Sequence, residues 1–352
     1  MIEEARHNPK LHAIALLTAA ATFPLIFMGG LVTSHGAGLS VPDWPNSWGY
    51  NMFLFPPRLW RGGIFYEHVH RLMGTVVGML SIALTIAAWK LESRRWVRWL
   101  CTGVLVAVIF QGVLGGLRVV LVKLDLAIVH ACFAQAFFCL AAMSAVVTSK
   151  WWISAKRDAE TPAGRALVIA CVFAVVAVYL QLVIGATMRH YEAGLAVPDF
   201  PFAYGQLFPS TDPQSLHKIN QQRIWKIDLP IVTANQVRLH MAHRMGAAVV
   251  ALAILASSGI VLLQHRHRIK VLVPALLLLL LLGAQIALGA ATVLYRKPAD
   301  VASAHVAVGA LILVTAFVLL VRSIRLYATP RAAQVLQTRD EMREIPEGAV
   351  MA

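Results

Sequence analysis

Charged residues are scarce in this sequence, and acidic residues are the scarcest among them. Asp, Glu, Lys and Arg together make up 14% of the 352 residues, whereas hydrophobic residues make up 59%. A typical soluble domain has about 25% charged residues. The shortage of charge excludes an ordinary soluble domain and an intrinsically disordered chain, and it indicates an integral membrane protein.

Cysteine is also rare, and its placement excludes two kinds of cross-linked fold. The chain has four cysteines, each inside an apolar run: Cys101, Cys132, Cys139 and Cys171. A disulfide framework or a cysteine-based zinc site would need cysteines that gather at short spacings or in an outer loop. We therefore expect the four thiols to pack in a hydrophobic core.

The sequence contains many long apolar runs. Eight of them reach the length of about 20 residues that a helix needs to cross a bilayer. They lie near 11–32, 68–89, 97–118, 126–148, 166–187, 240–263, 271–293 and 302–323. They lack the period-two alternation of barrel strands, and in hydrocarbon a helix satisfies its own backbone hydrogen bonds. The expected fold is an all-α polytopic membrane protein with eight transmembrane helices.

The net charge of +14 gathers on one side of an eight-helix arrangement. The basic residues on that side are Arg6, Lys10, Lys90, Arg94, Arg95, Arg98, Lys150, Lys156, Arg157, Arg165, Arg266, Arg268, Lys270, Arg322, Arg325 and Arg331. By the positive-inside rule both termini are cytoplasmic. This placement suits the lipid bilayer and argues against a nucleic-acid partner.

The chain contains two copies of one unit. The stretch AGLSVPDWP (37–45) returns as AGLAVPDFP (193–201), and QGVLGG (111–116) is matched by QIALGA (285–290). Because each unit has an even number of spans, the copies share one orientation and form parallel repeats. We predict two pseudosymmetric four-helix bundles, in residues 1–150 and 151–330, followed by a cytoplasmic tail in 331–352.

Four histidines occupy repeated positions at the outer ends of the even-numbered spans: His70, His130, His243 and His305. A single histidine in a membrane span is most often structural, but four symmetric ones favour ligation, because ionisable groups at this depth are costly unless used. Imidazole pairs suit the two axial positions of haem iron, whereas zinc would need three or four converging ligands. The simplest pairs are His70 with His130 and His243 with His305.

One acidic residue breaks the symmetry of the two halves. Glu67 lies three residues before His70, on the same helix face, whereas His240 takes that position before His243. A carboxylate beside only one site is expected if that site is reactive and the other supports it. The alternative for Glu67 is a structural acid near a helix start, stabilised by the helix dipole and by Arg71.

With these motifs the sequence resembles the heme A synthase family, and specifically its cysteine-less subgroup. The resemblance rests on the E-x-x-H-R motif of Glu67 to Arg71, on the PDWP loop (42–45), and on the remaining histidines His130, His243 and His305. Val41 and Ser47 stand where many members have a cysteine pair.

The resemblance implies an oxidoreductase that converts heme O to heme A for terminal oxidases. Heme O as substrate would lie between His70 and His130, and a heme b cofactor between His243 and His305. The C8 methyl group of heme O would be oxidised to a formyl group through the hydroxylated heme I, with Glu67 at the reacting methyl.

Further expectations concern the surroundings of these sites. Arg71 and Arg244 are expected to pair with haem propionates, because guanidinium binds carboxylate well; the alternative is interfacial snorkelling. His35 and His190 are secondary candidates for haem contact. For Asp43 and Asp199, turn hydrogen bonding is favoured over chemistry.

The family resemblance also implies a cellular setting. We expect a bacterial-type plasma (inner) membrane, with the haem sites toward the outer side. Heme O synthase and terminal oxidase assembly factors are candidate partners, and the sequence leaves a homo-oligomer open.

Two other functions remain open from the sequence. The first is a non-enzymatic diheme b-type cytochrome or haem carrier, which explains the four histidines but not Glu67. The second is a secondary transporter, which explains the repeats but would place its polar groups near the midplane of the membrane.

Overall fold

The computed structural model describes residues 6–156 and 161–327, and this part of the chain contains eight helices long and apolar enough to cross a membrane. They are α1 (Pro9–Ser34), α2 (Gly63–Leu91), α3 (Arg95–Leu121), α4 (Leu124–Thr148), α6 (Pro162–His190), α8 (Ala234–Gln264), α9 (Ile269–Leu294) and α10 (Ala299–Tyr327). The eight predicted spans are confirmed. The predicted tail, 331–352, lies outside the described residues.

Three of the eight long helices, α1, α6 and α8, begin directly after a polar residue whose side chain caps them. Asn8 caps α1 by accepting hydrogen bonds from the backbone amides of Lys10 and Leu11. Thr233 and Gln236 form a capping box that starts α8 six residues before the predicted start at residue 240. Hydropathy predicts the part of a helix that lies in hydrocarbon. In these helices the capping residue sets the first helical residue.

Each half of the chain forms a ring of four helices. In the first half, α1 packs on α2, α2 on α3, α3 on α4 and α4 on α1; the second half repeats this order with α6, α8, α9 and α10. Consequently α2 lies opposite α4, and α8 lies opposite α10. The halves meet through α1 and α4 on one side and α6 and α10 on the other. This arrangement confirms the two pseudosymmetric bundles. The exact boundary at residue 150, where the short helix α5 (Lys150–Ser154) begins, stays a prediction.

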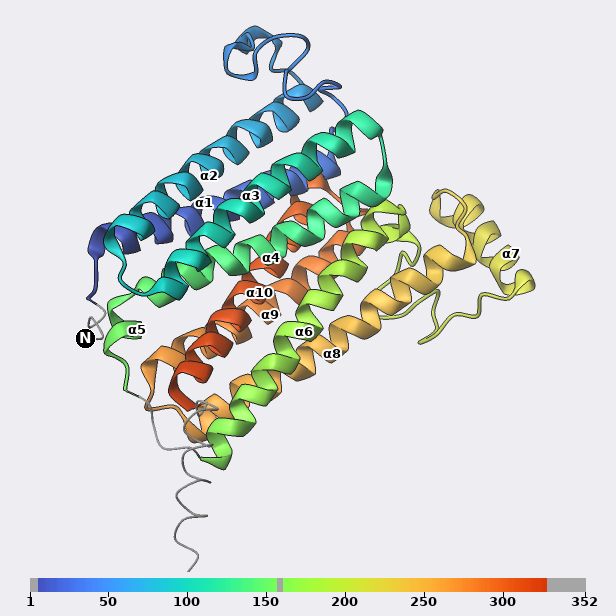
Figure 1. Cartoon of the computed structure of the whole chain (residues 1–352). Helices are drawn as coiled ribbons and strands as arrows, with labels where there is room; N and C mark the ends of the chain where they lie inside the picture. Colours follow the sequence, from blue (N-terminus) through green and yellow to red (C-terminus); the bar gives the residue numbers. More distant parts are fainter. Residues whose placement is uncertain (1–5, 157–160, 328–352) are drawn as a thin grey trace, which may run out of the picture.

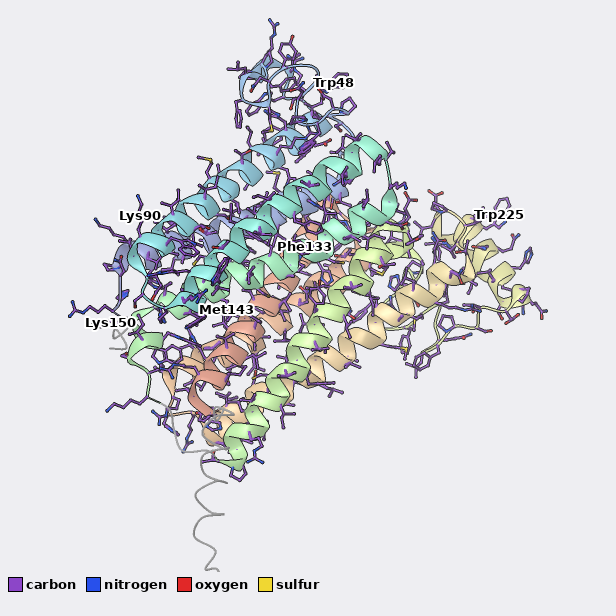
Figure 2. All side chains as sticks on the ribbon, viewed as in Figure 1. Trp48, Lys90, Phe133, Met143, Lys150 and Trp225 are labelled. Carbon is purple, nitrogen blue, oxygen red and sulfur yellow. The ribbon has the colours of Figure 1, made fainter. Side chains whose placement is uncertain are left out.

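The two ends of the helices differ in character. Figure 1 shows the two long loops at one end of the molecule and the N-terminus at the other. In Figure 2, Trp48 and Trp225 lie at the loop end, and Lys90 and Lys150 lie at the opposite end. The charge asymmetry expected from the sequence is therefore present, while the assignment of the basic end to the cytoplasm stays a prediction.

Short helical segments order the long loops. The first loop contains η1 (Met52–Leu54) and η2 (Pro57–Leu59). The second contains η3 (Ala193–Leu195), α7 (Pro213–Gln222) and the π-helical turn η4 (Arg223–Ile227), which form a lobe beside α8 (Figure 1). The polar insertion of the second loop is therefore a short helix with an irregular continuation.

A hydrophobic cluster fills the interior of each bundle, and cysteines take part in both. Cys101 packs in the cluster of the first half, and Cys139 and Cys171 pack with the cluster of the second. All four cysteines are free thiols. The expected packing in the core is confirmed for Cys101, Cys139 and Cys171, whereas Cys132 is only partly buried and lies outside both clusters.

Candidate functional site

Each of the four predicted histidines lies against a glycine of the neighbouring helix. The pairs are His70 with Gly29 of α1, His130 with Gly115 of α3, His243 with Gly185 of α6, and His305 with Gly289 of α9. A Cβ atom built on any of these glycines would lie 3.1 Å from Cε1 of its histidine. Only glycine lets the imidazole approach the neighbouring helix this closely without a shift.

The four histidines lie at one level of the molecule. Each falls within about the first three turns of its helix, counted from the end that carries the long loops. They project from α2 and α4, and from α8 and α10, which are the opposite helices of the two bundles. The structure therefore places all four at the same end, as the sequence predicts.

The second histidine pair faces across its bundle. The ring centres of His243 and His305 are 6.3 Å apart, with 69° between the ring planes. Metal–imidazole bonds are about 2 Å long, so two of them on opposite sides of one ion span a separation of this size between ring centres. In the first bundle His70 and His130 are close enough to interact electrostatically. Both predicted pairs are brought together, and ligation stays a prediction.

Three of the four histidines also contact a glutamine located four residues before the cradling glycine. Gln111 donates to the carbonyl of His130 at 2.8 Å, Gln181 donates to the carbonyl of His243 at 2.7 Å, and Gln285 contacts Nε2 of His305 at 3.4 Å. The corresponding residue beside His70 is Leu25. A Q-x-x-x-G pattern in three helices was the sequence signal for these neighbours, and the twofold repeat alone did not expose it.

Three of the histidine rings are enclosed beside the backbone of the neighbouring helix. Nδ1 of His70, His130 and His305 is buried and misses the geometry of a full hydrogen bond. Each of these imidazoles still interacts with a backbone group, of Leu25, Gln111 and Gln285 respectively, four residues before the cradling glycine. Within residues 6–156 and 161–327, no three or more His, Cys, Asp or Glu side chains gather as a metal-binding group. The donor set is therefore two imidazoles per bundle.

Glu67 is buried beside the first pair and both of its oxygens are hydrogen-bonded. Oε1 accepts from Nη2 of Arg71 at 2.9 Å, and Oε2 accepts from the backbone amide of Val41 at 2.9 Å. In the second half the equivalent His240 is buried and donates from Nδ1 to the carbonyl of Ala193 at 3.0 Å. The structure thus keeps the asymmetry that the sequence shows.

Arg71 and Arg244 hold the two outer loops in the same way. Arg71 donates to the carbonyls of Val41, Asp43 and Asn46, and Arg244 donates to the equivalent carbonyls of Val197, Asp199 and Phe202. These contacts occupy the guanidinium groups with backbone oxygens. Their pairing with haem propionates stays a prediction.

The aspartates of the repeated loops make the turn hydrogen bonds that we expected. Asp43 accepts from the backbone amides of Trp48 and Gly49, both at 2.7 Å. Asp199 accepts from Tyr204 at 2.8 Å and from Gly205 at 3.0 Å. Partial burial acts to raise the pKa of Asp43, but the amide hydrogen bonds outweigh it and hold that pKa below its ordinary value.

The secondary candidates His35 and His190 are not equivalent positions. His35 caps the end of α1 as Tyr191 caps the end of α6, so His190 corresponds to Ser34. His35 stacks on Tyr66 with 4.1 Å between ring centres. His190 lies within electrostatic range of Arg118 and Arg189. The two histidines are one position apart in the repeat, because His35 lies two residues before the repeated AGL and His190 lies three residues before it.

Comparison with known proteins gives a consistent relationship. The model of the family described as "Cytochrome oxidase assembly protein" matches residues 62–318. A protein of Shouchella clausii named "Heme A synthase" is 27% identical over 294 residues, which is 81% of this chain and 87% of that protein. Another of that name from Rhizorhabdus wittichii is 24% identical over 345 residues, covering 88% of this chain and 93% of that protein.

Proposed function

Because the chain belongs to the cytochrome oxidase assembly protein family, we propose that it is a heme A synthase. It oxidises the C8 methyl group of heme O to a formyl group and so supplies heme A to terminal oxidases. The relatives named "Heme A synthase" support this activity. The observation that carries the proposal is the single carboxylate, Glu67, beside one of two otherwise equivalent histidine pairs.

The two bundles take different roles. Heme O as substrate binds between His70 and His130, and heme b as cofactor binds between His243 and His305. Two observations support a haem at each pair: the two imidazoles come from opposite helices of one bundle, and a glycine lets each ring sit against its neighbouring helix. In the second pair the separation of the ring centres, 6.3 Å, also suits two imidazoles on one ion. Heme b, when bound, supplies a one-electron redox centre near the substrate site.

Glu67 acts on the methyl group that reacts. Oxidation of a methyl to a formyl group removes four electrons, in two two-electron steps through a hydroxymethyl intermediate. The first step takes its oxygen atom from a water molecule and releases two protons, the second releases two more protons, and an external electron acceptor takes up the four electrons. A fixed carboxylate in a water-poor site stabilises the positive charge that develops there, and it can also accept a proton. Arg71 and the amide of Val41 hold Glu67 in one orientation, so little reorganisation is needed.

The proposal includes a cellular setting for the reaction. We place the protein in a bacterial-type plasma membrane, with both termini in the cytoplasm and the haem sites near the outer surface. This location gives a lipid-soluble substrate access from the bilayer. Heme O synthase is the partner that would supply the substrate, and terminal oxidase assembly factors would receive the product.

One observation favours a second candidate function, a diheme b-type cytochrome or haem carrier without catalysis. The ion pair between Glu67 and Arg71 ties α2 to the first loop, which provides a structural reason for an acid at this position. A carrier would need the four histidines and the loop contacts, but no chemistry at Glu67.

Extraction of pigments from cells that express this chain together with a heme O supply separates the two functions. A heme A synthase yields the formylated haem, which is identified by its mass and by its pyridine adduct spectrum. A carrier binds haem with a normal spectrum and leaves heme O unchanged. That second result would overturn the proposed activity.

A further inference from the structure

Arg118 is a basic residue near the first site that comparison of the two sequence repeats did not identify. It lies on α3, three residues beyond the glycine that cradles His130, and is half-buried. Its Nη2 donates to the carbonyl of Gly38 at 2.8 Å, and a side chain at Gly38 would collide with this nitrogen. Glu67, His70 and His130 all lie within electrostatic range of Arg118.

Unlike Arg71, Arg118 has donors to spare. Arg71 uses both terminal nitrogens on three loop carbonyls and on Glu67. For Arg118 the hydrogen bond to Gly38 is the one made within the described residues, so Nη1 and Nε remain free for an acceptor. A half-buried guanidinium with two free donors suits a carboxylate, which it can bind through two parallel hydrogen bonds.

The second site has an arginine at a different position. The residue equivalent to Arg118 is Thr292, since both stand three residues after a cradling glycine, and its hydroxyl donates to the carbonyl of Leu288 in its own helix at 2.7 Å. The cation within electrostatic range of His305 is Arg189 of α6, which donates to the carbonyl of Gly30 and to the hydroxyl of Ser34. The position of Arg118 on α3 therefore has no arginine counterpart on α9, although each site has an arginine near it.

We propose that Arg118 binds a propionate carboxylate of heme O, and thereby directs toward Glu67 the side of the macrocycle whose pyrroles carry propionates, to which the C8 methyl belongs. This inference rests on the proposed function and deepens it. His190, which belongs to the other half of the chain, also lies within electrostatic range of Arg118.

The rigidity of the macrocycle converts this contact into selectivity. Heme O has four methyl groups on its ring, and two of them share a pyrrole with a propionate. If His70 and His130 held the iron, these two ligands alone would leave the macrocycle free to rotate. A carboxylate fixed on Arg118 would restrict that rotation and would favour, near Glu67, the two methyl groups that share a pyrrole with a propionate.

The binding test compares iron protoporphyrin IX with its dimethyl ester, which keeps the ring and the iron but lacks the carboxylate charges. Each is titrated into the purified protein that carries its resident haem, and binding is followed by the absorbance change that His70→Ala abolishes. The wild type should bind the free acid at least about tenfold more tightly, since a charge-assisted hydrogen bond contributes about 1.5 to 3 kcal/mol.

The variants then assign this preference to one residue. Arg118→Gln should lose most of the preference, and Arg118→Lys should recover part of it because it keeps the charge without the planar fork. Arg238→Gln is the matched control, because Arg238 is an exposed arginine at the same end of the molecule that bonds to Thr211. Its preference should equal that of the wild type.

Two results would overturn the inference: equal binding of acid and ester by the wild type, or a full preference in Arg118→Gln. The first of these results is measured on the wild type alone, so it cannot be attributed to a variant that folds poorly. Normal heme A formation together with either result would leave the proposed function intact. An Arg118-dependent preference without any formylated haem would instead refute the proposed function and leave the anion site standing.

Discussion

Glu67 and Arg71 form a buried ion pair, with 2.9 Å between Oε1 and Nη2. The same Nη2 donates to the carbonyl of Val41, whose amide donates in turn to Oε2 of Glu67. The carboxylate is therefore held from two directions, by its own helix and by the outer loop. The conformation of the first outer loop and the orientation of the Glu67 carboxylate therefore depend on each other.

Substitution of Glu67 by Gln tests its chemical role with little change in volume. Gln keeps one acceptor oxygen but loses the charge. We expect bound haem to remain and heme A formation to fall by about a hundredfold or more, with heme O or its hydroxylated form accumulating. Pigment extraction measures both quantities. The matched control is Glu192→Gln, an exposed acid in the second loop. Normal heme A in cells that rely on Glu67→Gln would end the catalytic assignment.

Removal of a histidine from the second pair tests the cofactor site. His243→Ala or His305→Ala removes one of two opposed ligands, and we expect most of the resident haem to be lost on purification. Haem absorbance per protein measures the loss. The control is His267→Ala, because His267 is exposed at the opposite end of α8. Unchanged absorbance in both ligand variants would contradict the pairing.

The glycines that lie against the histidines can be tested without changing any histidine. In α9, a Cβ at residue 289 would lie 3.1 Å from Cε1 of His305, whereas a Cβ at Gly283 meets nothing within 4 Å. Crowding of this kind costs about 1 to 3 kcal/mol, so Gly289→Ala should weaken haem binding about tenfold. Gly283→Ala should bind haem normally and should be at least as stable as the wild type, since alanine favours helix. Equal haem affinity in both variants would show that the cradle has no role.

The first loop should loosen in acid because of Asp43. Its pKa is below the ordinary value in the folded loop, so the disordered loop binds the proton more readily. The stabilisation is complete above the ordinary aspartate pKa of about 4 and is lost as pH falls through the lower folded value. Hydrogen exchange of the Trp48 and Gly49 amides, corrected for the intrinsic rate, measures it. Asp43→Asn should remove the dependence on pH. Protection of these amides that is flat across this range in the wild type would refute the prediction.

Several features were predictable because their causes are local. The eight spans follow from apolar runs long enough to cross hydrocarbon, and the bundle symmetry follows from the repeated AGL-x-VPD loop. The turn bonds of Asp43 and Asp199 follow from the known preference of aspartate for the amides of a tight turn. Each depends on a few neighbouring residues.

Other features depend on contacts between distant segments. Arg71 and Arg244 looked like partners for a ligand carboxylate, yet both guanidinium groups hold loops some 25 to 47 residues away in sequence. The glycines beside the histidines are ordinary helix residues until the neighbouring helix is placed. The Q-x-x-x-G pattern distinguishes Gly289 from Gly283, but its meaning is clear only once the neighbouring helix is placed.

The amino-acid sequence by itself determined the membrane class, the count of helices, the twofold repeat and the four histidines with one acid, because hydropathy and identity act residue by residue. Only the tertiary structure decided which helices stand opposite each other, which arginines are already occupied, and that Arg118 lies at the first site. Those outcomes depend on packing across the bundle, where each donor is either taken by a neighbour or left free.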